Sequence, residues 1–215
     1  MSDLTPLQSR FNDPRKTADE EESRLIDLIW ISSVLRSSEH FTARRRAQGY
    51  RLSGVVVLPL DGQPAHIEYS VDADAAWHTR RVDVSVTSPI LQRKWALAAD
   101  GVGHWVCDGV SESDLGGCVD IDLGWTPSTN TLPIRRLELE VGEARQVDVA
   151  WLRFPELILE RSSQTYEKRA EDTWRYSSGR FTADLQVDAN GIVHRYGDDL
   201  WTTIAVAAGH GDPPP

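Results

Sequence analysis

Strict alternation of apolar and polar residues is the feature that most limits what this chain can fold into. It recurs in separate stretches, among them residues 65–72, 81–87, 119–123 and 181–187. A period of two places the apolar side chains of a β-strand on one face and the polar ones on the other. Strands with one buried and one solvated face are typical of antiparallel sheets. The pattern predicts a mainly β protein of about ten or eleven strands, without repeated strand–helix–strand units.

Short dipeptides predict how some of these strands are connected. Asp61-Gly62 follows residues 52–58, and Asn190-Gly191 follows residues 181–187. Both dipeptides readily take the positive φ that tight hairpins require. Asp100-Gly101 is a third turn of this kind. Residues 137–141 alternate again, so we expect a further strand after Pro133, with Arg135 and Arg136 on opposite faces of it.

The first apolar segment fits two structures. Thr17 and Glu20 have the spacing of a capping box, which predicts a helix over the following residues. Ile26, Leu28 and Trp30 alternate, which predicts a first strand equally well. The sequence leaves both alternatives open.

The length of 215 residues suits one β domain. We expect a polar flexible segment over residues 1–24, the β domain over 25–204 and a flexible tail over 205–215. A sheet of so many strands must hide its apolar face. It can curl into a half-barrel, with an apolar cavity or a covering helix on the inner side, or split into a sandwich with a packed core.

Charge and targeting signals narrow the possible partners and location. The chain has 23 basic and 33 acidic residues, a net charge of −10, which repels polyphosphates and argues against nucleic acid as a partner. It contains neither a signal sequence nor an apolar run of the ~20 residues that a transmembrane helix needs. We therefore expect a cytoplasmic protein with Cys107 and Cys118 as free thiols, although the sequence leaves their pairing undecided.

Motifs that carry catalysis or bind metals are missing from the sequence. No nucleophile elbow, zinc-protease motif or glycine-rich phosphate loop occurs, and the six histidines have no ligand spacing. We predict no cofactor and no metal. Asp120 and Asp122 would share a strand face and could perturb each other's pKa, as acid/base pairs do, but solvated strand residues show the same spacing.

Tryptophan and one loop supply candidate binding residues. Eight tryptophans outnumber four phenylalanines, and Trp suits surfaces that are apolar at one end and wet at the other, such as lipid or sugar pockets, as well as cores. Residues 126–136 combine two prolines with short polar side chains around Asn130. This loop could hold a polar head group or be purely structural. We expect a buried, structural Asn130.

Three runs carry a family resemblance: SSEHFTARR at 37–45, AAWHTRRVDVSV at 75–86 and WTPSTNTLPIRRLEL at 125–139. Together they resemble the bacterial family described as putative glycolipid-binding, over roughly residues 28 to 201. The resemblance implies a curved antiparallel sheet, an unclosed barrel partly filled by short helices, similar to bacterial carriers of lipoproteins or lipids. It brings no established catalytic residues. The chain departs from the family pattern at Ser128, where an aromatic residue is usual.

The leading hypothesis is a binding protein without catalysis, which holds a glycolipid or other amphipathic ligand on the concave face of the sheet. An enzyme that uses Asp120 or Asp122 as acid/base and a protein-binding module with an exposed sheet edge are the alternatives. The predicted ligand-binding residues are Trp77, Arg80, Trp105, Trp125, Asn130, Arg135, Tyr166 and Tyr196.

Overall fold

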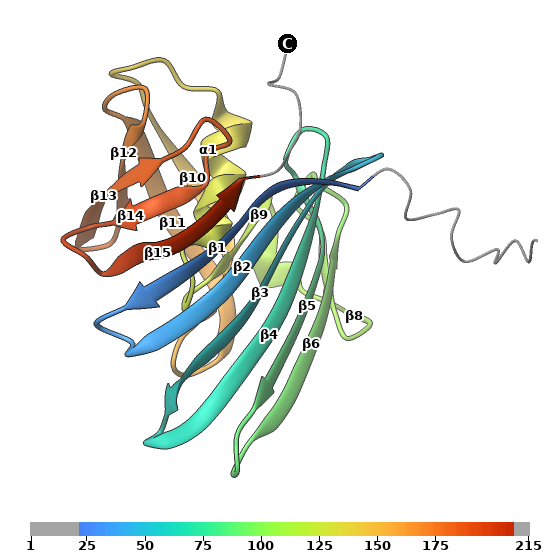
Figure 1. Cartoon of the computed structure of the whole chain (residues 1–215). Helices are drawn as coiled ribbons and strands as arrows, with labels where there is room; N and C mark the ends of the chain where they lie inside the picture. Colours follow the sequence, from blue (N-terminus) through green and yellow to red (C-terminus); the bar gives the residue numbers. More distant parts are fainter. Residues whose placement is uncertain (1–21, 209–215) are drawn as a thin grey trace, which may run out of the picture.

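The computed structural model describes residues 22–208 and arranges them as one large, curved sheet (Figure 1). The described residues begin in the middle of the sheet at β1 (Ser23–Ser32) and run to one edge through successive antiparallel strands, which we call the first meander. Its other strands are β2 (Ser37–Arg46), β3 (Gly49–Leu60), β4 (Gln63–Asp74), β5 (Thr79–Thr87), β6 (Gln92–Ala99), β7 (Trp105–Cys107) and β8 (Val110–Ser111).

The chain then passes to the opposite edge through residues 112–143, the crossing segment. It contains a 3-10 turn at Ser113–Leu115, β9 (Asp120–Leu123), a second 3-10 turn at Ser128–Asn130 and the helix α1 (Thr131–Leu137). The second meander returns to the middle, where its last strand pairs with β1. Its strands are β10 (Ala144–Arg153), β11 (Ile158–Lys168), β12 (Thr173–Ser178), β13 (Phe181–Val187), β14 (Val193–Tyr196) and β15 (Trp201–Ala208).

The predicted mainly β, antiparallel fold is confirmed, but the predicted number of strands is wrong. Residues 22–208 form fifteen strands, and β9 beside β10 is the one parallel pair among them. The additional strands include β7 and β8, which have three and two residues. So short a strand shows at most two alternations, too few to separate it from a loop by its pattern.

Residues 23–32 form a strand, so the helix alternative for this segment is wrong. Ile26, Leu28 and Trp30 are buried on its inner face, as their alternation predicts. The capping residues Thr17 and Glu20 lie outside the described residues. β15 continues to Ala208, which pairs with Ile26, so the sheet extends beyond position 204. The other residues expected to form a flexible tail also lie outside the described part of the chain.

The strand predicted after Pro133 is also wrong, because residues 131–137 form α1 and residues 138–143 are in no strand. Pro133 lies in the first turn of α1, where the missing N–H costs no intrahelical hydrogen bond. Leu132 packs in one apolar cluster of the protein and Ile134 in another. The helix therefore fills the space between two apolar surfaces, which a strand with one buried face could not do.

Two apolar clusters form the interior. The larger one lies along the inner face of the first meander, where Trp30, Phe41 and Leu52 have no exposed surface. The smaller one lies on the second meander and includes Tyr166, Trp174, Tyr176, Leu185 and Tyr196. α1 lies on the inner side of the curved sheet (Figure 1). The sheet thus curls rather than splits, and its own chain covers its inner face.

Candidate functional site

The crossing segment contacts the first meander through a buried polar cluster. The Thr126 hydroxyl donates to Glu39 Oε1 at 2.9 Å, and the Tyr69 hydroxyl bonds the same carboxyl oxygen and Ser128 Oγ at 2.8 Å. Gly54, on the strand between Glu39 and Tyr69, leaves room for the tyrosine ring, since a Cβ there would lie 2.4 Å from that ring. The first meander and the crossing segment are thereby linked inside the core.

Glu39 is a neutral acid under ordinary conditions. Its side chain is fully buried, and loss of solvation raises its pKa to about 8, despite the hydrogen bonds from Tyr69 and Thr126. Its second oxygen, Oε2, has no hydrogen-bond partner within residues 22–208. Glu39 therefore contributes a hydrogen-bonding carboxylic acid rather than a charge.

A second polar cluster connects the crossing segment to the second meander. The Tyr166 hydroxyl donates to Asn130 Oδ1 at 2.8 Å, and Asn130 Nδ2 donates to the Pro127 carbonyl at 3.2 Å. Asn130 is 7% exposed. Its amide thus bonds its own loop on one side and the sheet on the other, which agrees with the structural role that we expect for it.

Asp122 lies in the same polar cluster. Gln164 Nε2 donates to its Oδ2 at 2.5 Å, and the Thr129 hydroxyl bonds its Oδ1 at 3.4 Å. Burial of the carboxyl raises its pKa to about 6, and the two hydrogen bonds act in the opposite direction. Asp122 can therefore exchange a proton near neutral pH.

Asp120, two residues earlier, has a different environment. It has no exposed surface, and Arg136 of α1 binds both of its oxygens, Nε to Oδ1 at 3.1 Å and Nη2 to Oδ2 at 2.5 Å. The pKa of each aspartate is raised mainly by burial and not by the other carboxylate. The mutual perturbation expected of an acid/base pair is absent, since each carboxylate has its own hydrogen-bonding partners.

Aromatic rings continue this cluster across the second meander. Tyr166 and Tyr176 pack edge to face with ring centroids 5.3 Å apart, and Tyr196 lies 6.1 Å from Tyr176. Phe181 stacks on Tyr196 at 6.2 Å and is 44% exposed. The aromatic surface therefore extends from the interior to solvent.

An open groove of about 590 Å³ lies at the C-terminal end of α1, against β11, β12 and β13. Its buried floor is apolar and consists of Ile134, Leu139, Trp174 and Val187. Its rim is charged and carries Arg135, Lys168, Glu138, Glu171, Asp172 and Asp188. An apolar floor beneath a charged rim is amphipathic, and the volume is within the range of small-molecule sites.

The predicted ligand-binding residues fall in three places. Asn130 and Tyr166 contact each other in the interior, with Tyr196 two rings away. Arg135 lies on the rim of the groove, and its guanidinium carbon is 5.7 Å from the centre of the Trp77 ring. The structure does not bring the remaining three, Trp105, Trp125 and Arg80, into either group.

Those three residues have structural surroundings. Trp105 is buried and donates its indole N–H to the Cys118 carbonyl at 2.7 Å, and Trp125 has no exposed surface. Arg80 is exposed and pairs with Asp74 at 2.8 Å. Cys118, like Cys107, is a free thiol.

The sequence pattern did not single out Glu39, Tyr69 or the groove residue Trp174 as candidate site residues. Glu39 had a detectable signal, because it occupies the inward position between Ser37 and Phe41 in an alternating strand. A carboxylate in an apolar register is a reason to look for buried partners. Trp174 alternates with Tyr176, but nothing in that alternation shows which residues face them across the groove.

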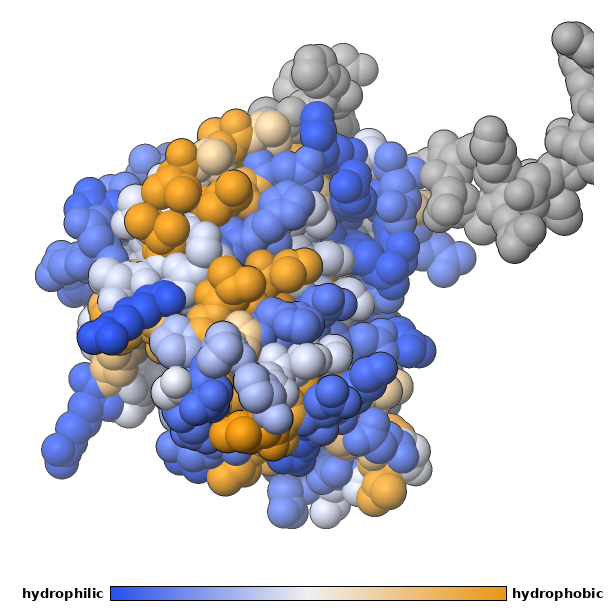
Figure 2. All heavy atoms as spheres, turned by 60° about the horizontal axis from the view of Figure 1, so that its bottom comes forward, coloured by the Kyte–Doolittle hydropathy of each residue, from blue (hydrophilic) through white to orange (hydrophobic). Residues whose placement is uncertain are grey.

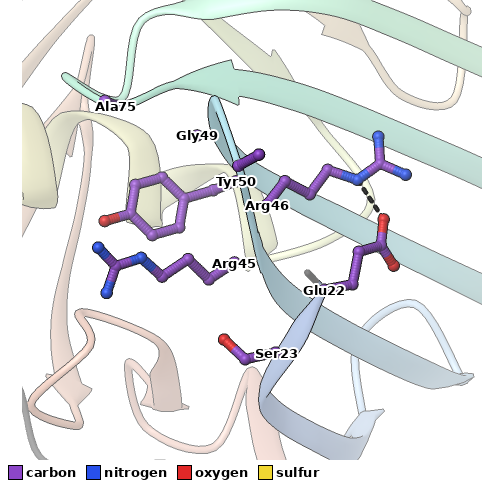
Figure 3. Close-up of a pocket in the computed structure, with 8 residues that line it drawn as sticks. Glu22, Ser23, Arg45, Arg46, Gly49, Tyr50 and Ala75 are labelled. Atoms are coloured by element: carbon purple, nitrogen blue, oxygen red, sulfur yellow. Dashed lines mark hydrogen bonds and ion pairs between the residues drawn. The ribbon is translucent and has the colours of Figure 1, made fainter. Parts of the chain in front are cut away.

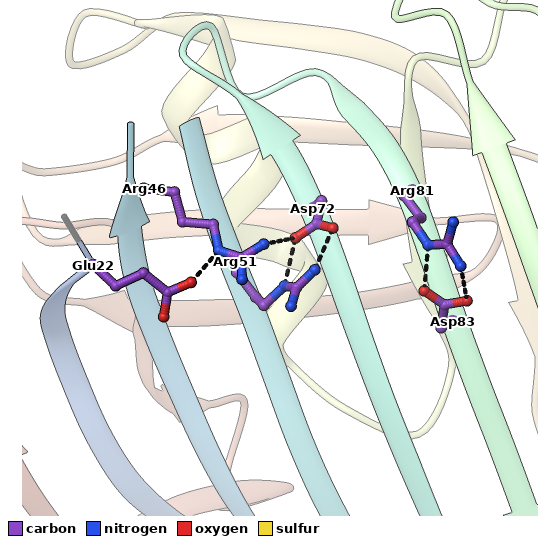
Figure 4. Close-up of polar contacts among 6 residues, drawn as sticks. All are labelled: Glu22, Arg46, Arg51, Asp72, Arg81 and Asp83. Atoms are coloured by element: carbon purple, nitrogen blue, oxygen red, sulfur yellow. Dashed lines mark hydrogen bonds and ion pairs between the residues drawn. The ribbon is translucent and has the colours of Figure 1, made fainter. Parts of the chain in front are cut away.

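Several arginines of the first meander pair with carboxylates. Figure 4 shows Arg46 between Glu22 and Asp72, Arg51 on Asp72, and Arg81 on Asp83. Exposed pairs of this kind contribute little to stability.

The fold and its interior define an open, barrel-like β protein in which the chain itself fills the inner face and an amphipathic groove remains at one end. The chain belongs to the family described as "Putative glycolipid-binding", whose model matches residues 27–201.

Two solved structures are similar to this one. A DUF1089 family protein from Pseudomonas aeruginosa is 32% identical, with a TM-score of 0.69 over 75% of this chain and 89% of that one. A β-barrel-like protein of the domain of unknown function DUF1849 from Brucella abortus is 11% identical, with a TM-score of 0.51 over 88% and 98%, and shares the fold alone. No protein with a curated description matches the chain. Within residues 22–208, no helix has the length and apolar character needed to cross a membrane.

Proposed function

We propose that the protein binds a glycolipid or a similar amphipathic molecule in the groove at the end of α1. The observation that carries this proposal is the combination of the apolar floor of Ile134, Leu139, Trp174 and Val187 with the charged rim around Arg135. The floor suits the apolar part of the ligand, and the rim offers hydrogen bonds and charge to a polar head group. The name of the family supports the same ligand class.

This proposal places the ligand in the groove and not on the concave face of the sheet, where the sequence alone had suggested it. Side chains of the first meander that would have held the ligand there, such as Phe41 and Val56, have no exposed surface beneath the crossing segment. An apolar ligand could reach them only by displacing that segment. The groove needs no such displacement, because it is already open.

Binding of an alkyl glycoside tests this proposal. Isothermal titration with octyl glucoside, below its critical micelle concentration, should give a saturable signal with the wild-type protein. Val187→Asp places a charge on the groove floor and should weaken binding at least tenfold. Val57→Asp is the matched control, since Val57 is 54% exposed outside the groove.

Two outcomes would contradict the proposal: equal binding by both variants, or no saturable binding to the wild type. Melting temperatures of both variants must lie close together for the comparison to count. Native mass spectrometry of protein purified from its host then identifies the physiological lipid by its mass.

One observation supports a second function, acid/base catalysis by Asp122. A carboxyl with a pKa of about 6 can accept a proton near neutral pH, and it lies beside the side chains of Gln164 and Thr129. Hydrolysis of a panel of nitrophenyl glycosides and esters tests it. Activity that falls at least a hundredfold in Asp122→Asn would support catalysis, and activity unchanged by this substitution would exclude Asp122 as the base.

The third alternative, a module that binds proteins through a sheet edge, has little support. The edge strands of the described sheet are β8, with two residues, and β9, most of which is buried. On the face that Figure 2 shows, hydrophobic groups are separated by hydrophilic ones rather than joined in one large patch. Strand addition requires a longer exposed edge.

A further inference from the structure

A second hollow, of about 540 Å³, lies at one end of the first meander and shares no lining residue with the groove (Figure 3). Ser23, Arg45 and Tyr50 line it from three adjacent strands. They form one row across the sheet, because Ser23 pairs with Arg45 and Arg45 pairs with Tyr50. Residues paired across neighbouring strands present their side chains on the same face. In Figure 3 Arg45 and Tyr50 extend side by side.

The polar groups of this row have unused hydrogen-bonding capacity. Within residues 22–208, Arg45 makes no ion pair, although its neighbours do: Arg44 lies 4.0 Å from Asp27, and Arg46 binds Glu22 and Asp72. In the same part of the chain, the side chains of Arg45, Tyr50 and Ser23 make no hydrogen bond. The Glu22 carboxylate, also in the lining, is neutralised by Arg46. One positive charge and two hydroxyls therefore remain to face the hollow.

The wall of the hollow is held in place from behind. The Tyr50 ring stacks on Trp77, with centroids 3.8 Å apart and planes 13° from parallel. Trp77 has a φ of +65°, a conformation that a bulky side chain seldom adopts without support from its surroundings. Arg135 of the crossing segment approaches Trp77 as well, with its guanidinium carbon 5.7 Å from the ring centre. Tyr50 is thus fixed before any ligand arrives, which reduces the entropy lost on binding.

We propose that this hollow is a binding site for an oxyanion, a phosphate or carboxylate group, with Arg45 as the main ligand. The planar guanidinium can bind two oxygens of the anion at once, and the hydroxyls of Tyr50 and Ser23 can donate to the remaining oxygens. The anion can be a free small molecule or the phosphate of a lipid head group. This site is separate from the groove and does not depend on the function proposed for the groove.

Titration of the full chain at low ionic strength tests the proposal, with inorganic phosphate and with dihexanoyl phosphatidic acid below its critical micelle concentration as separate probes. The wild type should bind at least one of the two. Arg45→Gln should weaken binding at least tenfold, and Tyr50→Phe should weaken it severalfold while the stack on Trp77 is kept. Arg44→Gln is the matched control, because it removes the same charge from the neighbouring residue, which faces the other side of β2.

The two probes distinguish the sources of the anion. Equal Arg45-dependent affinity for both would support a site for free anions, and at least tenfold tighter binding of the lipid would support a lipid phosphate. Equal losses in Arg45→Gln and Arg44→Gln would overturn the proposal, because they would indicate general surface charge. Absence of binding by the wild type would also overturn it. Octyl glucoside carries no charge, so its binding in the groove should be unchanged in Arg45→Gln.

Discussion

The first and second meanders share the same up-and-down strand order but bury different chemistry. The inner face of the first is almost entirely apolar, and its one buried acid, Glu39, has a pKa raised to about 8. The inner face of the second carries the hydroxyls of Tyr166, Tyr176 and Tyr196 around Asp122, whose pKa is about 6. The apolar interior of the first meander contributes mainly to stability. The second meander, with its buried polar groups, lies next to the amphipathic groove.

A few neighbouring residues of the crossing segment form hydrogen bonds on both sides, toward the first and toward the second meander. Thr126 and Ser128 bond the acid and the tyrosine of the first meander, Asn130 bonds Tyr166 of the second, and Thr129 bonds Asp122 of β9. A short run of small polar side chains thus satisfies buried groups on two sides. The core therefore needs this loop, whatever ligand the protein binds.

The loss of unfolding free energy on removal of a large side chain should differ strongly between a buried site in the first meander and a half-exposed site in the second. Phe41→Ala, in the apolar half, should reduce the free energy of unfolding by about 3–5 kcal/mol, because Phe41 has no exposed surface and stacks on Trp30 at 4.7 Å. Phe181→Ala, in the other half, should cost about 1 kcal/mol, since Phe181 is 44% exposed. Urea denaturation measures both, and similar losses would remove the distinction between the halves.

The buried acid of the first meander should make stability depend on pH. Glu39 keeps its proton up to about pH 8 in the folded protein and loses it near pH 4.5 in the unfolded chain. The unfolded chain therefore binds fewer protons between these values, and stability falls as the pH rises. The expected contribution between pH 5 and pH 8 is about 3 kcal/mol.

Glu39→Gln isolates this contribution. The variant keeps an oxygen that can accept from Tyr69 and Thr126 but does not titrate. The difference in unfolding free energy between wild type and variant should shift in favour of the variant as the pH rises from 5 to 8. A difference independent of pH would show that Glu39 does not hold its proton in the folded state.

Loss of the hydrogen bond between Asn130 and Tyr166, which links the crossing segment to the second meander, should reduce the stability less, and the two substitutions should not be additive. Asn130→Ala should destabilise the protein by about 1–3 kcal/mol and Tyr166→Phe by about 1 kcal/mol, because each leaves a buried partner without a hydrogen bond. The double variant should lose less than the sum of the two. Additive losses, or loss of ligand from Asn130→Ala without a lower melting temperature, would contradict the structural role of Asn130.

Substitutions on the outer, solvent-exposed face of the sheet should change the stability least. Asp83→Asn breaks the contact with Arg81, whose side chain is 61% exposed, and should change stability by less than about 0.5 kcal/mol. Thermal unfolding in low and high salt checks this, with Phe41→Ala as the contrasting variant. A loss of several degrees would show that the pairs in Figure 4 stabilise the sheet more than exposed pairs usually do.

Local pattern alone predicted several of the strands and some of their connections. The alternation at residues 65–72 and 181–187 is realised in β4 and β13, and Asp61 and Gly62 both take the positive φ expected of their turn. These features depend on neighbours in sequence, so the sequence contains the information directly. It also identified Arg135 as a candidate binding residue, which the structure places on the rim of the groove.

The contacts between these strands and loops could be known only from the folded structure. Alternation shows that a residue faces inward, but not which surface it will face, so it could not bring Leu139, Trp174 and Val187 together as the floor of one groove. For the same reason Glu39 gave no sign that Thr126, 87 positions later, would bond it. Residues 131–137 became a helix rather than a strand because apolar surfaces lie on two sides of them, and those surfaces belong to strands far away in the sequence.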